Sequence, residues 1–320
     1  MKYFILSPRG GFNDMCNVIW QCYKYCVKYD RILVIDTRYG IEFQDDIKNY
    51  LIFSDPTIYM GDMDRLYNQL QNEDGYPSKF YPSLFKDAIG NRVCVYKVGD
   101  LKIRVNLSKD YKENVIFHIN CGRGNGIEHV FKKLISGFTP IVMNELHNRF
   151  NSLPSDYISI HVRNTDYKSN VPYFMKINDV NFRDKDIFIA TDDINTINVF
   201  KTRYGNSKIR TFSNLSKSED ADGLHFSVRK NNQMFIVDLI CDFVLLCYGK
   251  EYYHSNKKSG FSKNVHLFRK DMSGLGVVTG INSKNILYIE NEERKYIRLR
   301  CVCIGIIMMF IIFLIFKILI

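Results

Sequence analysis

Residues 1–36 read MKYFILSPRGGFNDMCNVIWQCYKYCVKYDRILVID, and the spacing of their apolar residues changes twice. Tyr3 to Leu6 form a short apolar run, which is typical of a buried strand, and a Gly-Gly turn follows it. From Asn13 the apolar residues recur at helical spacing, and a second apolar run, Ile32 to Ile35, ends at Asp36. A strand, a helix and a strand in this order predict a βαβ unit with parallel strands.

Further strand and helix patterns follow the same alternation. The stretch from about Tyr39 to Lys112 has no clear period, and we expect inserted helices and loops there. Strands are expected at 115–120, 157–163, 186–191, 209–212 and 251–255, and helices near 194–204 and 234–248. This order predicts an α/β protein with two Rossmann-like domains that face a cleft. The N-terminal domain would span 1–150, a linker 151–155, and the C-terminal domain 155–285.

The composition sets limits on the class of protein. The chain has 320 residues, enough for two domains, with 46% hydrophobic and 24% charged residues. These values exclude a disordered chain, a coiled coil and a collagen-like fibre. A net charge of +10 favours an anionic partner. Because the sequence has no nucleic-acid-binding motif, we expect no nucleic-acid partner.

Residues 301–320 read CVCIGIIMMFIIFLIFKILI, which is long and apolar enough to cross a bilayer as a helix. The alternative is a buried core helix, but such a helix normally carries a polar stripe. Three basic residues precede the segment: Lys295, Arg298 and Arg300. They predict a single-pass, tail-anchored membrane protein whose globular part is cytosolic. A luminal position in the ER or Golgi is the alternative, and only there would the sequons at Asn106 and Asn214 matter.

The densest group of chemically active residues is His161-Val162-Arg163-Asn164-Thr165-Asp166. In a strand, His161 and Arg163 point to the same side. They would stand at the carboxyl end of a parallel strand, where α/β folds bind ligands. The guanidinium of Arg163 suits phosphate oxygens, and Asp166 could fix that side chain. The alternative is an edge strand with a surface ion pair.

Three other places could contribute to the same cleft. Thr191 and Asp192 end a predicted strand, and either could cap the next helix. Asp238 and Asp242 lie one helical turn apart. The turn Ser259-Gly260-Phe261-Ser262 precedes a helix, so its backbone amides and hydroxyls could bind phosphate.

Signals for a metal site are weaker. The D-x-D pattern occurs at 62–64, 184–186 and 220–222, as chance allows in a chain with many Asp residues. The nine cysteines include no C-x-x-C pair, so zinc is not expected. Glycines at 122, 124 and 126 could cradle phosphate but lack a P-loop lysine, and a cleft loop is favoured. We therefore predict chemistry that does not depend on a metal.

The order of these motifs resembles the GDP-fucose-dependent fucosyltransferases. HVRNTD at 161–166, IATDD at 189–193, an Asp-bearing helix and SGFS at 259–262 follow each other as in that family. The resemblance is strongest to the group that contains α1,6-fucosyltransferases and protein O-fucosyltransferases. GGFND at 10–14 is similar to the G-G-F-N loop of the same group.

The resemblance implies a GT-B-like fold and a role for each motif. Arg163 would hold the β-phosphate of GDP-fucose, with His161 and Asp166 supporting its loop. Ser259 and Ser262 would bind diphosphate oxygens.

The guanine base and the sugar would be held by other residues. Asp242, or Asp238 one turn earlier, would accept hydrogen bonds from guanine, and Asn13 would reach across the cleft to the sugar or β-phosphate. The remaining donor-binding residues implied by the resemblance are Gly10, Gly11, Thr191 and Asp192. Many α1,6-type enzymes carry a second Arg where this chain has Asn164, which leaves the acceptor linkage open.

These inferences together predict a membrane-anchored, inverting glycosyltransferase that needs no cofactor. It would transfer fucose from GDP-fucose to a hydroxyl of a glycan or protein. Asp14 and Glu128 are candidate bases, and neither is preferred. Alternatives are the same fold with another nucleotide sugar, a catalytically inactive transferase-like membrane scaffold, and, from charge alone, a membrane-tethered nucleic-acid binder. Intact Arg163 and Asp166 favour an active enzyme.

Overall fold

The structure is a computed structural model. It describes residues 1–38, 43–72, 79–86, 89, 105–122, 124–164, 168–213, 215 and 232–271. These residues belong to one compact unit, Met1–Val278. Asp166 and the predicted membrane segment 301–320 lie outside the described residues. Of the helices within the described ranges, none has both the length and the apolar composition needed to cross a membrane.

The first sheet has four parallel strands in the order β2-β1-β5-β4. These strands are β1 (Tyr3–Arg9), β2 (Ile32–Ile35), β4 (Phe80–Tyr81) and β5 (Val115–Cys121). Helix α1 (Phe12–Lys28) connects β1 to β2 and places Asp14 in its first turn and Lys28 in its last, as the helix dipole favours. The parallel βαβ unit predicted from residues 1–36 is therefore confirmed.

The second sheet also has four parallel strands, in the order β10-β7-β8-β9. Its strands are β7 (Ile158–Val162), β8 (Ile187–Thr191), β9 (Ile209–Arg210) and β10 (Tyr252–His254). Its helices are α6 (Val171–Ile177), α7 (Asp179–Phe182), α8 (Ile194–Tyr204), α9 (Asn232–Tyr248) and α10 (Gly260–Lys270). Every residue of β8 is buried, as a central strand with covered faces requires.

The segments around and between the sheets are shorter. They comprise η1 (Ile47–Asn49), β3 (Leu51–Phe53), α2 (Met63–Asn72), η2 (Ser83–Lys86), α4 (Gly126–Lys133), β6 (Ile135–Phe138) and α5 (Pro140–Asn151). Strands β3 and β6 form a separate antiparallel pair. Helix α5 packs against α9 of the C-terminal half, where the Cys241 thiol contacts the Val142 carbonyl at 4.0 Å. The linker expected at 151–155 thus follows a helix that already packs on the second half.

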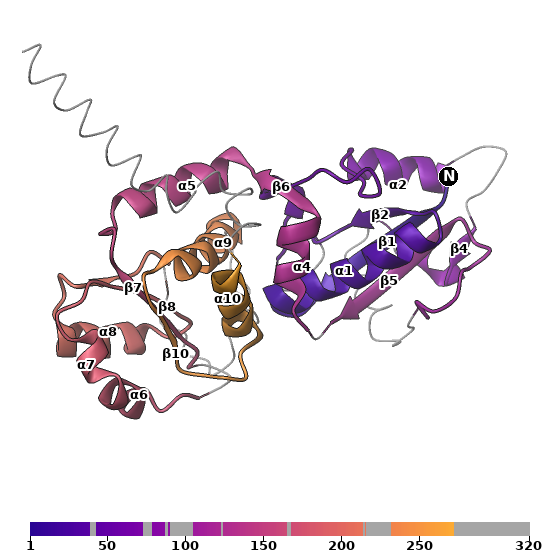
Figure 1. The fold of residues 1–320 in the computed structure, drawn as a ribbon. Helices are drawn as coiled ribbons and strands as arrows, with labels where there is room; N and C mark the ends of the chain where they lie inside the picture. The colour runs from indigo at the N-terminus through magenta and orange to yellow at the C-terminus, as the bar shows by residue number, and fades with distance from the viewer. Residues whose placement is uncertain are drawn as a thin grey trace, which may run out of the picture. The chain divides into compact units, whose positions relative to one another are not determined.

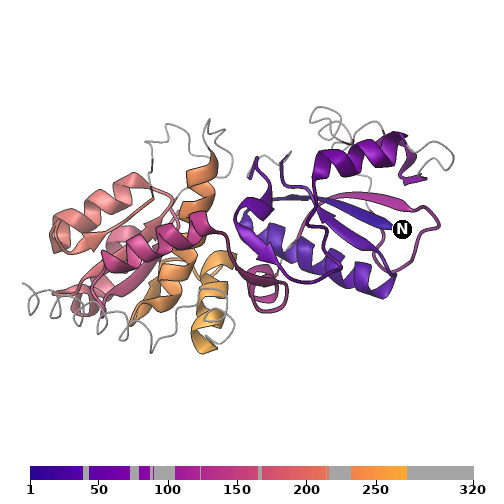
Figure 2. The ribbon, with the colours of Figure 1, turned by 90° about the horizontal axis from the view of Figure 1, so that it is seen from above.

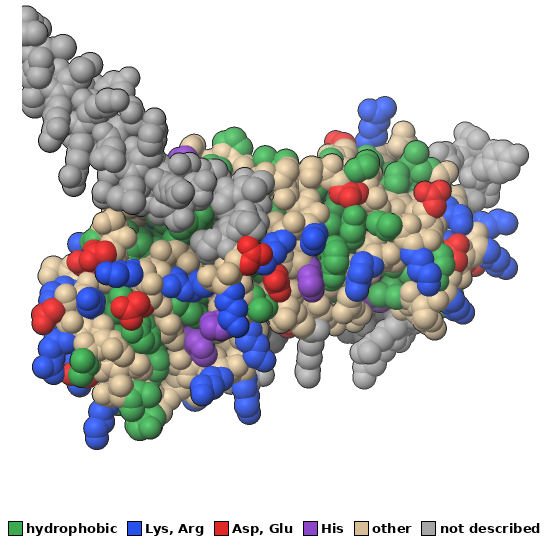
Figure 3. Space-filling model, in the orientation of Figure 1, with side chains coloured by type: hydrophobic (Ala, Val, Ile, Leu, Met, Phe, Trp, Pro, Cys, Tyr) green, Lys and Arg blue, Asp and Glu red, His purple; other side chains and the backbone are tan. Residues whose placement is uncertain are grey.

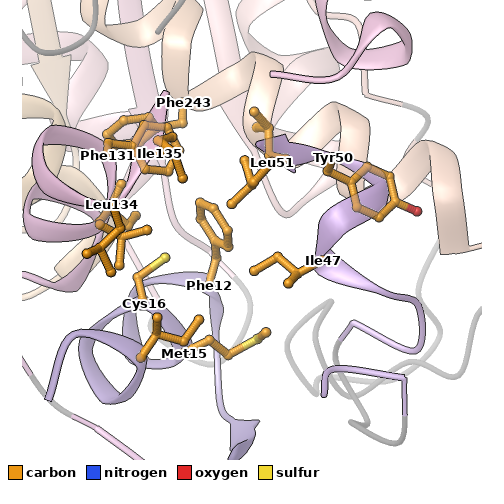
Figure 4. Packing of buried hydrophobic residues seen from close by; sticks show 14 of the residues in the cluster. Phe12, Met15, Cys16, Ile47, Tyr50, Leu51, Phe131, Leu134, Ile135 and Phe243 are labelled. Carbon is orange, nitrogen blue, oxygen red and sulfur yellow. The ribbon is translucent and has the colours of Figure 1, made fainter. Parts of the chain in front are cut away.

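An apolar core runs without interruption from one half of the unit to the other. The Phe131 ring on α4 contacts Phe12 of the first half at 6.1 Å and Phe243 of the second at 5.5 Å between ring centroids. Figure 4 shows Phe131, Phe12 and Phe243 in one cluster with aliphatic side chains. Helix α10 lies beside α1 at this junction, as Figures 1 and 2 show. The two halves are therefore packed together through their cores.

Candidate functional site

A cavity of ≈ 610 Å³ opens where the carboxyl ends of strands from both sheets approach each other. Residues that follow β1, β7 and β8 line it, together with α9 and the first turn of α10. The volume suits a small-molecule ligand. The predicted site residues in its lining are Gly11, Asn13, His161, Arg163, Thr191, Asp192, Asp238, Asp242 and Ser259. Sequence motifs that lie far apart along the chain, from Gly11 to Ser259, are thus brought to one cavity.

His161 and Arg163 stand at the carboxyl end of β7. The Nδ1 atom of His161 lies 2.6 Å from the Ser262 hydroxyl. Burial, reinforced by the positive charge of Arg163 and by His254, lowers the pKa of His161 to about 3, so its imidazole is neutral at physiological pH. The backbone N–H of Arg163 donates to the Ser255 hydroxyl at 3.2 Å. A fixed backbone thus places Arg163 in the wall of the cavity.

Asn164 anchors the loop after β7. Its backbone N–H donates to Asp192 Oδ1 at 2.7 Å, and its side-chain Nδ2 donates to Asp193 Oδ2 at 2.8 Å. Asn164 therefore joins the ends of β7 and β8. Asp193 also caps α8 by accepting from the backbone amide of Thr196, so the predicted caps, Thr191 and Asp192, are wrong.

The first turn of α10 forms another part of the wall. Ser259 caps this helix by accepting from the backbone N–H of Ser262 at 3.3 Å. Ser259 lines the cavity, but Ser262 is buried outside the lining and bonds to His161. Of the two serines expected at a ligand, only Ser259 therefore lies in the cavity wall. Helical geometry turns the Ser262 side chain toward β7.

Two lysines that sequence reasoning missed border this turn. Lys258 and Lys263 are exposed and line the cavity, and neither side chain forms an ion pair with a described residue. Elsewhere, Lys and Arg side chains are spread over the visible face of the molecule and alternate with Asp and Glu (Figure 3). Together with Arg163, these lysines give the cavity three cations beside a helix N-terminus, which is an arrangement suited to an anion.

A buried arginine faces the two predicted aspartates of α9. Arg149 of α5 bonds to Asp238, and its Nη1 lies 3.4 Å from Asp242 Oδ1. The Ser213 hydroxyl donates to Asp242 Oδ2 at 2.6 Å. Burial raises the pKa of Asp242 to about 7, which the negative charge of Asp238 supports and the contacts to Ser213 and Arg149 oppose. Near neutral pH, Asp242 is therefore protonated in part of the molecules.

The two aspartates differ in what they can offer a ligand. Both are 8% exposed and line the cavity. Both oxygens of Asp242 are bonded to protein side chains, whereas Asp238 uses only Oδ1, so its Oδ2 has no partner among the residues that the structure describes. Asp238 is therefore the acceptor available to a ligand, in place of the first-ranked Asp242.

Asn13 and Gly10 differ from their predicted roles. The Nδ2 of Asn13 donates to the Gly124 carbonyl at 2.8 Å, and its Oδ1 accepts from Asn264 at 2.6 Å. Asn13 thus borders the cavity, but its carboxamide is bonded to protein.

Gly10 has a φ of +92° and lies outside the lining, and a Cβ there would come within 2.7 Å of the Cys121 thiol. Gly10 serves the turn, and Gly11 alone of the pair reaches the cavity.

The glycine loop after β5 packs against α1. Among its glycines, Gly126 is the tightest, because a Cβ there would lie 1.9 Å from the backbone nitrogen of Asn17. Gly122 and Gly124 also face Asn17, and Gly124 borders the cavity. The prediction of a cleft loop agrees with this position.

Replacement of Gly126 by alanine is expected to lower the free energy of unfolding by about 3 kcal/mol, because backbone must move to admit the methyl group. Gly11→Ala is the matched control, since nothing lies within 4 Å of its Cβ position. Its expected cost is below about 1 kcal/mol. Urea unfolding of both variants measures the difference, and equal stabilities would contradict the tight contact.

Three of the described D-x-D aspartates, Asp62, Asp64 and Asp184, form contacts with neighbouring residues. Asp62 accepts from a backbone amide at the start of α2, and Asp64 and Asp184 pair with Arg38 and Lys208. Residues 220–222 lie outside the described residues. Within the described ranges, no three His, Cys, Asp or Glu side chains are grouped to hold a metal ion.

Comparison with known structures places the fold. The NodZ α-1,6-fucosyltransferase co-crystallised with GDP matches with a TM-score of 0.51 at 16% identity, over 83% of this chain and 92% of that chain. NodZ soaked with GDP-fucose gives 0.51 at 17%, over 83% and 92%. NodZ from Bradyrhizobium gives 0.50 at 17%, over 83% and 93%. No family model and no curated protein matches the sequence. The likeness establishes a fucosyltransferase-like fold, which confirms the resemblance drawn from the motifs.

Proposed function

We propose that this chain, which has the fold of the NodZ fucosyltransferase, is an inverting glycosyltransferase that transfers fucose from GDP-fucose to a hydroxyl acceptor. The observation that carries the proposal is the cavity itself. It joins three cations and a helix N-terminus to a buried carboxylate with one available oxygen. A nucleoside diphosphate sugar has the matching groups, which are a dianionic diphosphate and a base with hydrogen-bond donors.

The diphosphate would bind between Arg163 and the first turn of α10. When the bond between the sugar and the diphosphate breaks, negative charge grows on the leaving phosphate. A fixed guanidinium and backbone amides stabilise that charge more in the transition state than in the ground state. Lys258 and Lys263 would add positive charge at the same end. Neutral His161 would hold the Ser262 side of the turn in place.

The guanine base would be recognised by Asp238. Guanine presents an N1–H and an adjacent amino group as donors, and the available Oδ2 of Asp238 can accept from both. Arg149 contacts Asp238 directly and supplies the positive charge that a buried carboxylate needs beside it. Uracil presents a single ring N–H between two carbonyls, so it cannot make the same paired contact. This arrangement favours GDP over UDP donors.

The acceptor would approach along the wall that the N-terminal half contributes. Of the two carboxylates considered as base, Asp14 lines the cavity, whereas Glu128 lies outside the lining and bonds to Lys132 at 3.2 Å. Asp14 would therefore orient the attacking hydroxyl and accept its proton, while the hydroxyl oxygen displaces the diphosphate in one inverting step. A glycan or protein acceptor, and anchoring by residues 301–320, belong to the same proposal.

Hydrolysis of a donor panel by the full chain tests the proposal. GDP-fucose, GDP-mannose, UDP-glucose and UDP-N-acetylglucosamine are compared without acceptor, and the released nucleotide is measured. GDP-fucose is expected to be consumed fastest. A faster reaction with a UDP sugar would assign another donor. Absence of both turnover and GDP binding would favour the scaffold alternative.

Asp238→Asn is expected to reduce the preference for GDP over UDP by about 10- to 100-fold, because a charge-assisted bond to the base is worth about 1.5–3 kcal/mol. Asp242→Asn is the matched control, since its oxygens already bond to protein. It should change the preference by less than about threefold. Dissociation constants for the two nucleotides measure both variants. A larger effect at Asp242 would reverse the assignment.

A further inference from the structure

Three separate segments meet at a pair of buried carboxamides. Asn264 of α10 is completely buried, and Asn13 at the start of α1 is 9% exposed. The Nδ2 of Asn264 donates to the Oδ1 of Asn13 at 2.6 Å. This bond connects the turn after β1 to a helix of the C-terminal half.

Each remaining polar group of Asn264 also has a partner. Its Nδ2 donates to the Gly260 carbonyl at 2.8 Å, in the first turn of α10. Its Oδ1 accepts from the backbone N–H of Glu128 at 3.0 Å, in the first turn of α4. A fully satisfied buried polar group fixes the relative position of everything that it bonds to.

The start of α10 approaches this pair closely. A Cβ at Gly260 would lie 2.7 Å from the Nδ2 of Asn13. Only glycine therefore lets the first turn of α10 come this near to α1. Ser259, Gly260 and Lys263 of that turn line the cavity, whereas Asn264 does not.

We propose that Asn264 is a positioning residue, which with Asn13 holds the first turn of α10 at the diphosphate end of the cavity. The inference rests on the proposed function for the identity of the ligand. In this view Asn13 acts through Asn264 and not by contact with the donor. The bond makes the position of the anion-binding turn depend on the N-terminal half.

The competing view is direct contact between Asn13 and the donor. The two views differ in a double-mutant cycle with Asn13→Ala, Asn264→Ala and the double variant. If both residues act through one bond, each single variant weakens GDP binding by about tenfold, and the double variant is no weaker than the worse single one. Direct contact predicts that the two losses multiply.

Guanosine separates a change in position from general damage. It lacks the diphosphate, so loss of the positioned turn should leave its affinity within about twofold. Asn178→Ala is the matched control, because Asn178 bonds to the Phe174 carbonyl at 2.8 Å on α6, away from the cavity lining. It should leave both affinities unchanged. An equal loss of guanosine and GDP binding in Asn264→Ala would overturn the proposal.

Hydrogen exchange of the ligand-free full chain tests the positioning role of Asn264 separately from the proposed function. Asn264→Ala and Asn13→Ala should each speed amide exchange at Glu128 and in the first turn of α10 by at least about tenfold. Unchanged exchange in both variants would overturn the positioning role even if GDP binds. Faster exchange in the two variants, together with a wild-type chain that fails to bind GDP, would retain the positioning role and reject the proposed ligand.

Discussion

Replacement of Arg149 by alanine is expected to lower the free energy of unfolding by about 3–5 kcal/mol, because it leaves two buried carboxylates without their cation. Arg149 is 2% exposed and bonds to Asp238 and Asp242, and its Nε donates to Glu145 at 2.8 Å. Its guanidinium also lies over the Phe212 ring, 5.4 Å from the centroid. Arg149→Lys should recover little, because an ammonium cannot reach three carboxylates in different directions.

The same variant should show a characteristic dependence on pH. Burial already raises the pKa of Asp242 to about 7 in the folded protein, above its value in the unfolded chain. Because the charge of Arg149 opposes this rise, its loss is expected to raise the folded-state pKa of Asp242 further. A raised carboxyl pKa costs stability as pH rises from the unfolded value toward the folded one. The deficit of Arg149→Ala relative to wild type should therefore be larger at pH 8 than at pH 5.

Arg203→Ala is the matched control for this measurement. Arg203 is also paired with an aspartate, Asp179, at 2.8 Å, but its side chain is 46% exposed. Because solvent screens an exposed ion pair, the expected loss of stability is much smaller than for Arg149→Ala. Chemical unfolding at the two pH values compares the variants. Equal losses would mean that the Arg149 cluster is solvated and not the buried network described above.

Arg163→Ala is expected to reduce turnover of the donor by at least about 100-fold, which is the usual effect of removing one transition-state charge contact. Ground-state binding of GDP should fall less, because the charge on the leaving diphosphate is greatest in the transition state. Arg163→Lys should restore little of the rate, since a point charge cannot reproduce the planar pair of donors.

Arg210→Ala provides the comparison for Arg163. Arg210 ends β9 of the same sheet and donates to the Ser207 carbonyl at 2.6 Å, and it does not line the cavity. The turnover of Arg210→Ala should match that of the wild-type protein. Initial rates with saturating donor, together with melting temperatures, measure both variants. A folded Arg163→Ala protein with undiminished turnover would remove the residue on which the proposed chemistry depends.

Local sequence patterns predicted the parts of the fold that depend on local geometry. The βαβ unit at the N-terminus follows from apolar spacing alone, and β7 places His161 and Arg163 at the cavity because strand ends meet at one sheet edge. The antiparallel strands β3 and β6 were not predicted from the sequence. Each is at most four residues long, so the period of two has too few repeats to be recognised.

Contacts between residues far apart in the sequence could not be predicted from local sequence patterns. Nothing next to Asn13 in sequence indicates that Asn264 will occupy its carboxamide, and the partner of Asp238 lies on another helix. One signal for Arg149 was present. Val142, Leu146 and Arg149 fall on the same buried face of α5, and an arginine at a position where the spacing calls for an apolar residue indicates a buried charge partner.

The aromatic contacts around Phe131 affect the order in which the parts of the chain can fold during synthesis. Phe131 packs on Phe243 and Phe268, which a ribosome adds long after α4 has emerged. Until then, the nascent N-terminal half carries an uncovered apolar face. Its sheet can form early, but its core closes only when α9 and α10 arrive. Completion of the cavity and completion of the fold are thus the same late event in biosynthesis.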